Sequence, residues 1–232
     1  MDADPGPSAD DAKRYWNAAA NDNAAWYIAT GFTSENDAFF ESGSREADEY
    51  LDIAGVSVVH GSTLVELGCG AGRMTRRLAE LAARVKAVDI SSEMLSHARK
   101  NLEDLTNIDY VEVSGEGWLP FDDDSVDAVF SYITMQHVPH SEQQLRYLAE
   151  GLRITAPGGW VLMQFRRGGL IPRVLDWIGH FRHLLSGRRT MSAAWRGARV
   201  SEEALLSLGG DRVQIEILRP SRRHIWVLGR PR

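Results

Sequence analysis

Residues 63–75, TLVELGCGAGRMT, decide the fold of this 232-residue chain. Residues 63–67 are mostly apolar and include β-branched side chains, so they are predicted to form a short buried strand. Gly68, Gly70 and Gly72 follow at alternate positions, and residues 74–85 then have helical spacing. Because glycine has no Cβ atom and adopts φ > 0 easily, a strand, a glycine turn and a helix in this order let the backbone approach a ligand closely. Glu66, at the carboxyl end of the strand, is expected to face the same crevice.

A second strand and helix are predicted in residues 85–100, VKAVDISSEMLSHARK. The apolar run 85–90 contains Asp89, about 20 residues beyond the glycines, where dinucleotide-binding folds place a carboxylate for a ribose. Such a carboxylate can accept hydrogen bonds from both ribose hydroxyls. Ser91 or Ser92 is expected to cap the next helix, which opens with Glu93.

The spacing of the glycines separates two classes of Rossmann-like protein. The dinucleotide fingerprint GxGxxG would place its third glycine at Arg73, whereas this sequence has GxGxG with Glu66 two residues before the first glycine. Together with Asp89 and the later segments, this pattern resembles motif I of the Rossmann-like (class I) S-adenosylmethionine-dependent methyltransferases. The resemblance spans roughly residues 60–165.

The resemblance implies that the cofactor is S-adenosyl-L-methionine and that the product is S-adenosyl-L-homocysteine. The three glycines would let the backbone approach the methionine part of the cofactor, whose end Glu66 would orient. Asp89 would bind the ribose and Ile90 would flank the adenine. Ser131, in a later predicted strand, would close the pocket.

Composition limits the possible classes of protein. With 232 residues and 44% hydrophobic content, the chain can bury one core, and it has no apolar run of about 18 residues that could span a membrane. The single cysteine, Cys69, precludes an internal disulfide and a multi-cysteine metal site, and no metal is expected. The formal net charge of −6 argues against nucleic-acid binding. The acidic N-terminus does not resemble a signal or transit peptide, so we expect a cytoplasmic location.

The order of the predicted elements indicates an α/β fold with a doubly wound, mostly parallel seven-stranded sheet and an antiparallel terminal strand. Tyr15 and Trp16 lie in the first predicted helix, and they either pack it onto the sheet or line the cofactor. The chain is expected to be one domain, with an N-terminal helical cap (1–58), a Rossmann-like cofactor-binding core (59–165), a helical insertion or lid (166–212) and a C-terminal strand pair (213–232).

The loop after the third predicted strand carries the expected adenine contacts. Residues 114–121, SGEGWLPF, resemble the family's acidic loop, often GDAxxLPF, with Glu116 in place of aspartate and one residue fewer before LPF. Glu116 or the Gly117 amide would bond to the adenine edge, and Trp118 would cover the ring. The alternative is that Glu116 is an exposed loop acid.

A histidine follows the strand predicted over residues 126–133. Ligands of doubly wound sheets bind outside the carboxyl ends of the strands, so His137 lies where the methyl acceptor is expected. The arrangement resembles the site of small-molecule O-methyltransferases, in which that histidine is the general base, and a neutral imidazole with a pKa of about 6.5 can take a hydroxyl proton. A structural or substrate-shaping role is the alternative. Gln136 and His140 are further candidates for substrate contacts, although His140 can instead precede a helix cap at Ser141.

The segment 166–200 is rich in arginine, and its apolar residues follow one helical stripe. It is compatible with a lid over the substrate, with a basic helix on a membrane surface, or with a helix packed on the core. The expected function is methyl transfer to a small molecule, in the first place O-methylation of a hydroxyl on a bacterial metabolite or sugar. N-methylation of a small amine is the alternative within this chemistry. A Rossmann oxidoreductase and a noncatalytic membrane-surface protein are the alternatives from other classes.

Overall fold

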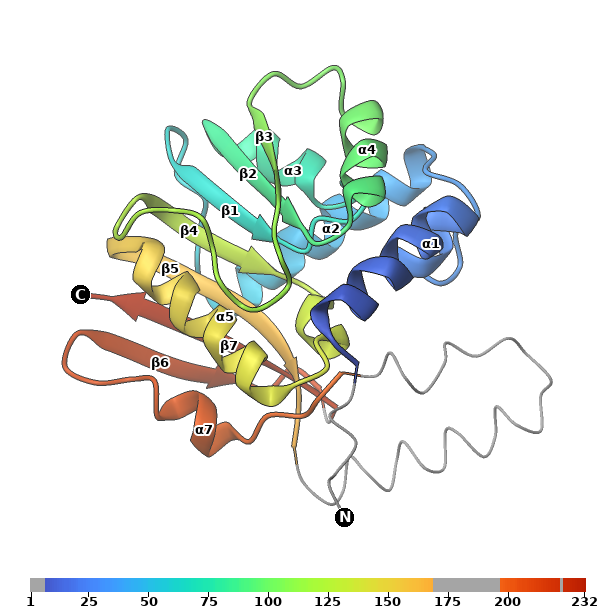
Figure 1. Cartoon of the computed structure of the whole chain (residues 1–232). Helices are drawn as coiled ribbons and strands as arrows, with labels where there is room; N and C mark the ends of the chain where they lie inside the picture. The colour runs from blue at the N-terminus through green and yellow to red at the C-terminus, as the bar shows by residue number, and fades with distance from the viewer. Residues whose placement is uncertain (1–6, 169–196, 222) are drawn as a thin grey trace, which may run out of the picture.

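The computed structural model describes residues 7–168, 197–221 and 223–232. Seven strands form one sheet in the order β3-β2-β1-β4-β5-β7-β6 (Figure 1). Strands β1 to β5 run parallel, and β7 pairs antiparallel with both of its neighbours. The predicted fold class is therefore confirmed. The strands are β1 (Thr63–Leu67), β2 (Arg84–Asp89), β3 (Ile108–Glu112), β4 (Val126–Ser131), β5 (Thr155–Arg166), β6 (Val213–Leu218) and β7 (His224–Pro231).

Helices surround the sheet, and their ends follow the expected sequence signals. The Ser91 hydroxyl accepts from the Met94 amide at 3.1 Å, which selects Ser91 over Ser92 as the cap of α4. Gly55 ends α2 in the left-handed conformation, with φ of 61°. The helices are α1 (Ala9–Ile28), α2 (Asp37–Ala54), α3 (Thr75–Leu81), α4 (Ser92–Asn101), the 3-10 turn η1 (Thr134–His137), α5 (Ser141–Ile154) and α7 (Glu202–Leu206).

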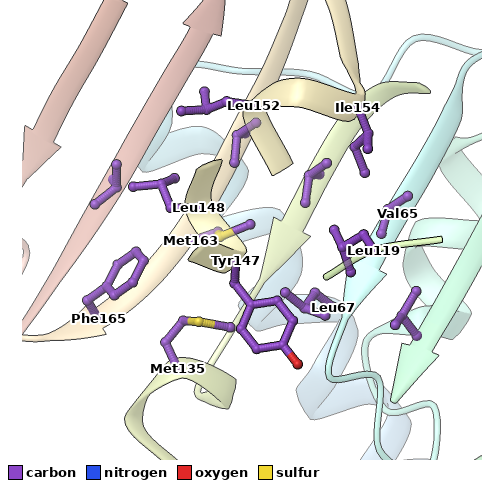
Figure 2. Close-up of a cluster of buried hydrophobic side chains, with 14 of the residues drawn as sticks. Val65, Leu67, Leu119, Met135, Tyr147, Leu148, Leu152, Ile154, Met163 and Phe165 are labelled. Carbon is purple, nitrogen blue, oxygen red and sulfur yellow. The ribbon is translucent and has the colours of Figure 1, made fainter. Parts of the chain in front are cut away.

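The central strands are buried on both faces, which explains their nearly continuous apolar sequences. Leu64 and Leu162 pack with α2 and α3, whereas the next residues along the same strands, Val65 and Met163, pack with α5. Figure 2 shows the cluster on the α5 side, where Leu148 lies among strand side chains.

Strand β5 contains an irregularity near its start. The segment 155–159, TAPGG, has the proline and glycines of a turn but belongs to the strand, where Val126 pairs with Thr155 and Ala128 pairs with Trp160. The extra residues on β5 are accommodated at Gly158, whose φ is +86°. This sequence therefore forms a bulge within the ladder.

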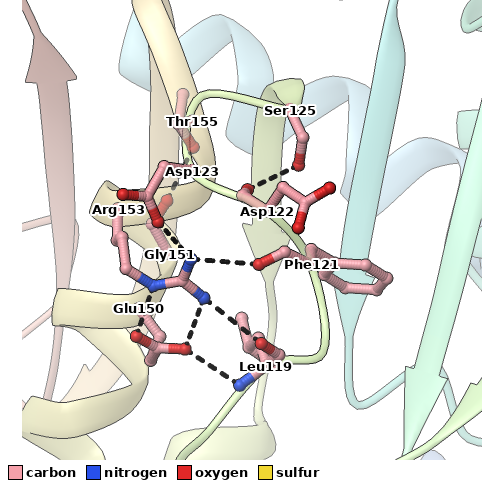
Figure 3. A network of polar contacts seen from close by, with 9 residues as sticks. All are labelled: Leu119, Phe121, Asp122, Asp123, Ser125, Glu150, Gly151, Arg153 and Thr155. Atoms are coloured by element: carbon pink, nitrogen blue, oxygen red, sulfur yellow. Dashed lines mark hydrogen bonds and ion pairs between the residues drawn. The ribbon is translucent and has the colours of Figure 1, made fainter.

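The loop before β4 is fixed to α5 by a partly buried ion pair between Glu150 and Arg153 (Figure 3). Glu150 accepts from the Leu119 amide at 3.1 Å and from the Arg153 guanidinium at 2.7 Å. Arg153 also donates to the carbonyls of Phe121 and Leu119, at 3.0 and 3.2 Å, and to Asp123 at 2.6 Å. These contacts lower the pKa of Glu150 and hold residues 119–123 in place.

Two expectations concern segments that the structure covers only in part. The apolar stripe and the arginines of the predicted insertion fall mainly on residues 169–196, which lie outside the described ranges. In the described part of this predicted helical insertion, the short helix α7 follows Ser201, whose hydroxyl accepts from the Ala204 amide at 3.1 Å. None of the helices in the described part of the chain is long and apolar enough to cross a bilayer.

Candidate active site

A cavity of about 1090 Å³, part of it open to solvent, lies at the carboxyl ends of β1, β2 and β4. Residues of α1 and the glycine turn form two of its walls, and η1 forms a third. Of the predicted site residues, those that line the cavity are Trp16, Glu66, Gly68, Gly70, Asp89, Ile90 and His137.

The glycine turn has the backbone conformation that its sequence predicts. Gly68, Gly70 and Gly72 have φ of 79°, 55° and 88°. A Cβ atom on Gly68 would lie 2.0 Å from the Thr134 hydroxyl, and one on Gly70 would lie 2.8 Å from Ile28 Cδ1. The glycines are therefore required by the close packing of η1 and α1 over the turn, in addition to any approach of a ligand. Gly72 does not line the cavity, and its face packs against the end of α4.

Asp89 joins the end of β2 to the glycine turn. Its two carboxylate oxygens accept from the amides of Gly70 and Ser91, each at 2.9 Å. Burial raises the pKa of Asp89, and these amides oppose the shift. Each oxygen has a second lone pair, so the carboxylate can accept two further hydrogen bonds from a ligand in the cavity.

Glu66 is the second buried carboxyl group of the cavity, with 4% of its surface exposed. The Thr75 hydroxyl donates to it at 2.6 Å. Burial raises the pKa of Glu66 to about 8, against the opposing effects of Thr75 and Arg73. The Arg73 guanidinium itself bonds to Glu46 at 2.7 Å and to Ser42 at 3.1 Å. Glu66 therefore lacks a direct cationic partner among the described residues.

Helix α1 covers the cavity and is docked through its polar side. The Ser91 hydroxyl donates to Asn17 Oδ1 at 2.6 Å, and Lys13 pairs with Glu112. These contacts bring the Trp16 ring to the cavity, where its centroid lies 5.1 Å from that of His137 in an edge-to-face arrangement. Tyr15 does not line the cavity and packs edge-on against Trp16.

The residues around His137 differ in where they point. Gln136 Nε2 lies 3.3 Å from His137 Nε2, but Gln136 lines a second cavity instead of the first. His140 lines neither cavity: it immediately precedes α5, and its Nε2 lies 3.2 Å from the Pro7 carbonyl. Of the three polar candidates on this segment, only His137 reaches the first cavity.

The predicted adenine loop reaches the cavity one residue earlier than expected. Gly115 lines it, whereas Glu116, Gly117 and Trp118 do not. Trp118 is 55% exposed, with the Arg146 guanidinium 5.6 Å from its ring centroid.

Two further placements concern buried hydroxyl groups. Ser131 is fully buried behind the cavity wall, and its hydroxyl donates to the Leu67 carbonyl at 2.9 Å, so it braces β1 against β4. Tyr147 of α5, which sequence reasoning missed, lines the cavity, and burial raises its pKa to about 12. Among the described residues there is no cluster of three or more His, Cys, Asp or Glu side chains that could hold a metal ion.

Sequence comparison finds a family match in the part of the chain that includes the glycine turn and Asp89. Residues 65–163 match the family model of a methyltransferase domain. The chain is 33% identical over 103 residues to a ubiquinone biosynthesis O-methyltransferase of Paraburkholderia xenovorans, covering 44% of this chain and 43% of the relative. It is 32% identical over 104 residues to a demethylmenaquinone methyltransferase of Tropheryma whipplei, covering 45% and 41% of the two chains. The chain thus spans less than half the length of these curated relatives.

Solved structures extend the likeness over nearly the whole chain. Magnesium protoporphyrin IX methyltransferase from Synechocystis, solved with bound S-adenosylhomocysteine, superposes with a TM-score of 0.65 at 18% identity, covering 94% of this chain and 96% of the other. Geranyl diphosphate C-methyltransferase from Streptomyces coelicolor superposes with a TM-score of 0.63 at 17% identity, covering 99% of this chain and 100% of the other. At these identities the likeness shows a shared fold.

Proposed function

We propose that this chain, which carries a Rossmann-like (class I) methyltransferase domain, transfers a methyl group from S-adenosylmethionine to a small molecule. The observation that carries the proposal is the pair Glu66 and Asp89. These two buried carboxyl groups lie at the carboxyl ends of neighbouring strands and face one cavity at the glycine turn.

The charge of the cavity favours this cofactor over a nicotinamide dinucleotide. A carboxylate buried without a counter-charge is costly, and the raised pKa of Glu66 reflects that cost. S-adenosylmethionine carries a sulfonium and an ammonium group, which would supply the missing positive charge. The pyrophosphate of a dinucleotide would add negative charge beside Glu66 and Asp89, so the oxidoreductase alternative is disfavoured on electrostatic grounds.

Each lining residue then has a defined part in binding. Asp89 would use its two free lone pairs for the ribose hydroxyls, and Glu66 would hold the cationic methionine end. Ile90 and Gly115 pack closely, since a Cβ atom on Gly115 would lie only 2.4 Å from Ile90 Cδ1. Both line the cavity, and together they would flank the adenine. We assign the adenine contact to this pair in place of Glu116, Gly117 and Trp118.

The cofactor, when bound, supplies an electrophilic methyl group on a sulfonium sulfur. The protein aligns the acceptor with that methyl group and excludes water, and most of the rate enhancement in such a displacement comes from this positioning. For a hydroxyl acceptor, a proton must also be removed. His137 lines the cavity beside Trp16, where a neutral imidazole can accept that proton.

We favour O-methylation over N-methylation because His137, a possible base for a hydroxyl proton, lines the cavity. A neutral amine attacks through its own lone pair and needs less help from a base. If the acceptor is an amine, replacement of His137 should therefore leave the turnover number nearly unchanged.

Two measurements test the proposal. In a thermal-shift comparison, S-adenosylhomocysteine should raise the melting temperature, whereas NAD⁺ at the same concentration should not. In a transfer assay with a labelled methyl group, screened over phenols, sugars and amines, at least one acceptor should become labelled. Stabilisation by NAD⁺ alone would refute the proposal.

A further inference from the structure

A second cavity, with about 640 Å³ of empty space that includes open solvent, adjoins the first. Tyr132 and Ile133 line both cavities, so the two cavities meet at these residues. Ile133 has φ of +64°, which is unusual for a β-branched residue and concentrates backbone strain at the dividing wall. Glu66, Asp89, Ile90 and Gly115 line the first cavity and do not line the second.

Its inner wall carries a carboxamide. Gln164 of β5 is 6% exposed and lines the cavity. At this place the amide can bond with a ligand that enters the cavity. A carboxamide both donates and accepts, which matches a hydroxyl group.

A second polar contact on this wall leads back to the first cavity. His224 Nε2 lies 3.2 Å from Gln136 Oε1, and Gln136 Nε2 lies 3.3 Å from His137 Nε2. One amide therefore connects the imidazole of the first cavity with that of the second.

The rest of the wall is aromatic. Tyr50 lies between Tyr132 and Trp226, with ring centroids 4.8 and 4.7 Å away. Tyr132 and Trp226 are nearly parallel, with an interplanar angle of 5°. Such a surface favours a planar ring, through apolar burial and aromatic contacts.

The charge around the cavity selects between possible ring substituents. Burial, and then the guanidinium groups of Arg166, Arg223 and Arg199, lower the pKa of His224. The same guanidinium groups disfavour a cationic amine beside His224. The acidic lining residue is Glu49, which is exposed at the rim, where water screens its effect.

We infer that the second cavity binds the methyl acceptor and that the acceptor is a hydroxylated aromatic ring. One polar substituent of the ring is held by Gln164 and His224, and the reacting hydroxyl lies at Tyr132 and Ile133, where the second cavity meets the first. This inference rests on the proposed function. In the reaction, an oxygen lone pair forms the new bond to the methyl carbon, the carbon–sulfur electron pair stays on sulfur, and the hydroxyl proton passes to His137. Gln136 is then a positioning residue for that imidazole.

The test uses 4-methylphenol as the probe and benzylamine, a cation of similar size, as its counterpart. Binding of both to the full chain saturated with S-adenosylhomocysteine is measured by NMR titration, and a crystal structure of the wild-type protein with 4-methylphenol locates the ring. The variants are Gln164→Leu and, as a matched control outside both cavities, Gln214→Leu on the exposed side of β6.

We expect 4-methylphenol to bind at least tenfold more tightly than benzylamine and to lie beside Gln164. Gln164→Leu should weaken its binding about tenfold, as expected for one lost hydrogen bond in a buried site, with unchanged affinity for S-adenosylhomocysteine. Gln214→Leu should change neither affinity.

Three results would overturn the subsite while leaving the proposed function intact: no binding of 4-methylphenol to the loaded protein, a ring located elsewhere, or equal binding by the folded Gln164→Leu variant. If Gln164→Leu does not fold, the location of the ring in the wild-type crystal decides. If S-adenosylhomocysteine itself does not bind, the proposed function fails, and the subsite fails with it.

Discussion

Replacing Glu66 by glutamine should make the protein's stability less dependent on pH. The unfolded chain releases the Glu66 proton near pH 4.5, whereas the folded protein, in which burial raises the pKa to about 8, retains it. Ionisation therefore favours the unfolded state as pH rises between these values. Glutamine has nearly the same shape, can still accept from Thr75, and does not ionise, so the variant escapes this cost.

The size of the effect follows from the two pKa values. As the pH rises from 5 to 8, the wild-type protein should lose roughly 3.5 kcal/mol of its free energy of unfolding through the ionisation of Glu66. Glu66→Gln should not show this loss. Urea denaturation at several pH values measures this difference. Glu103→Gln, an exposed position after α4, serves as the matched control and should run parallel to the wild type.

The same residue should couple cofactor binding to proton release. A cationic ligand beside Glu66 lowers its pKa, so binding near pH 7 should release up to about one proton, seen as a dependence of the binding enthalpy on the buffer. Glu66→Gln should lose that dependence. Parallel stability profiles for the wild type and Glu66→Gln would show that Glu66 is not held protonated, and the electrostatic reasoning would be refuted.

Further predictions concern the base, the turn and the loop anchor. His137→Ala should lower the turnover number by about 10²–10⁴-fold on a hydroxyl acceptor with little change in cofactor affinity; equal losses in both would exclude a basic role. Gly68→Ala should reduce the free energy of unfolding by at least about 2 kcal/mol more than the control Gly55→Ala. Both glycines have positive φ, but only at Gly68 would the added Cβ atom clash, with Thr134. Equal losses in the two variants would contradict this reasoning. Arg153→Met should cost about 2–4 kcal/mol in a denaturant titration, and a loss within error of zero would show that the ion pair does not anchor the loop.

The half of the candidate site at the glycine turn could be predicted because its residues lie within one short stretch of sequence. Glycines at alternate positions after a buried strand require a tight turn, and Asp89 follows at the expected distance. The structure adds that Asp89 also accepts two backbone amides, so this carboxylate shapes the turn as well as facing the cavity.

The other half could not be predicted, because it depends on the pairing of distant strands. Gln164 and Trp226 lie opposite each other in the β5–β7 register, and the contact from Gln136 to His224 spans 88 residues. No local pattern in the sequence indicates either contact. That Gly115 lines the first cavity, whereas Glu116 does not, could not be predicted for a related reason, since the position of Gly115 depends on its packing against Ile90.

Titration of S-adenosylmethionine into the wild-type protein and into Asp89→Asn, followed by calorimetry near pH 8, tests the central claim most directly. Two carboxylates at the glycine turn should bind the cofactor, so we predict a clear binding signal for the wild type. Asp89→Asn should bind at least about tenfold more weakly, provided that its melting curve still shows a folded protein. No heat with the wild-type protein, or equal affinity in the folded variant, would contradict the assignment of this cavity to S-adenosylmethionine.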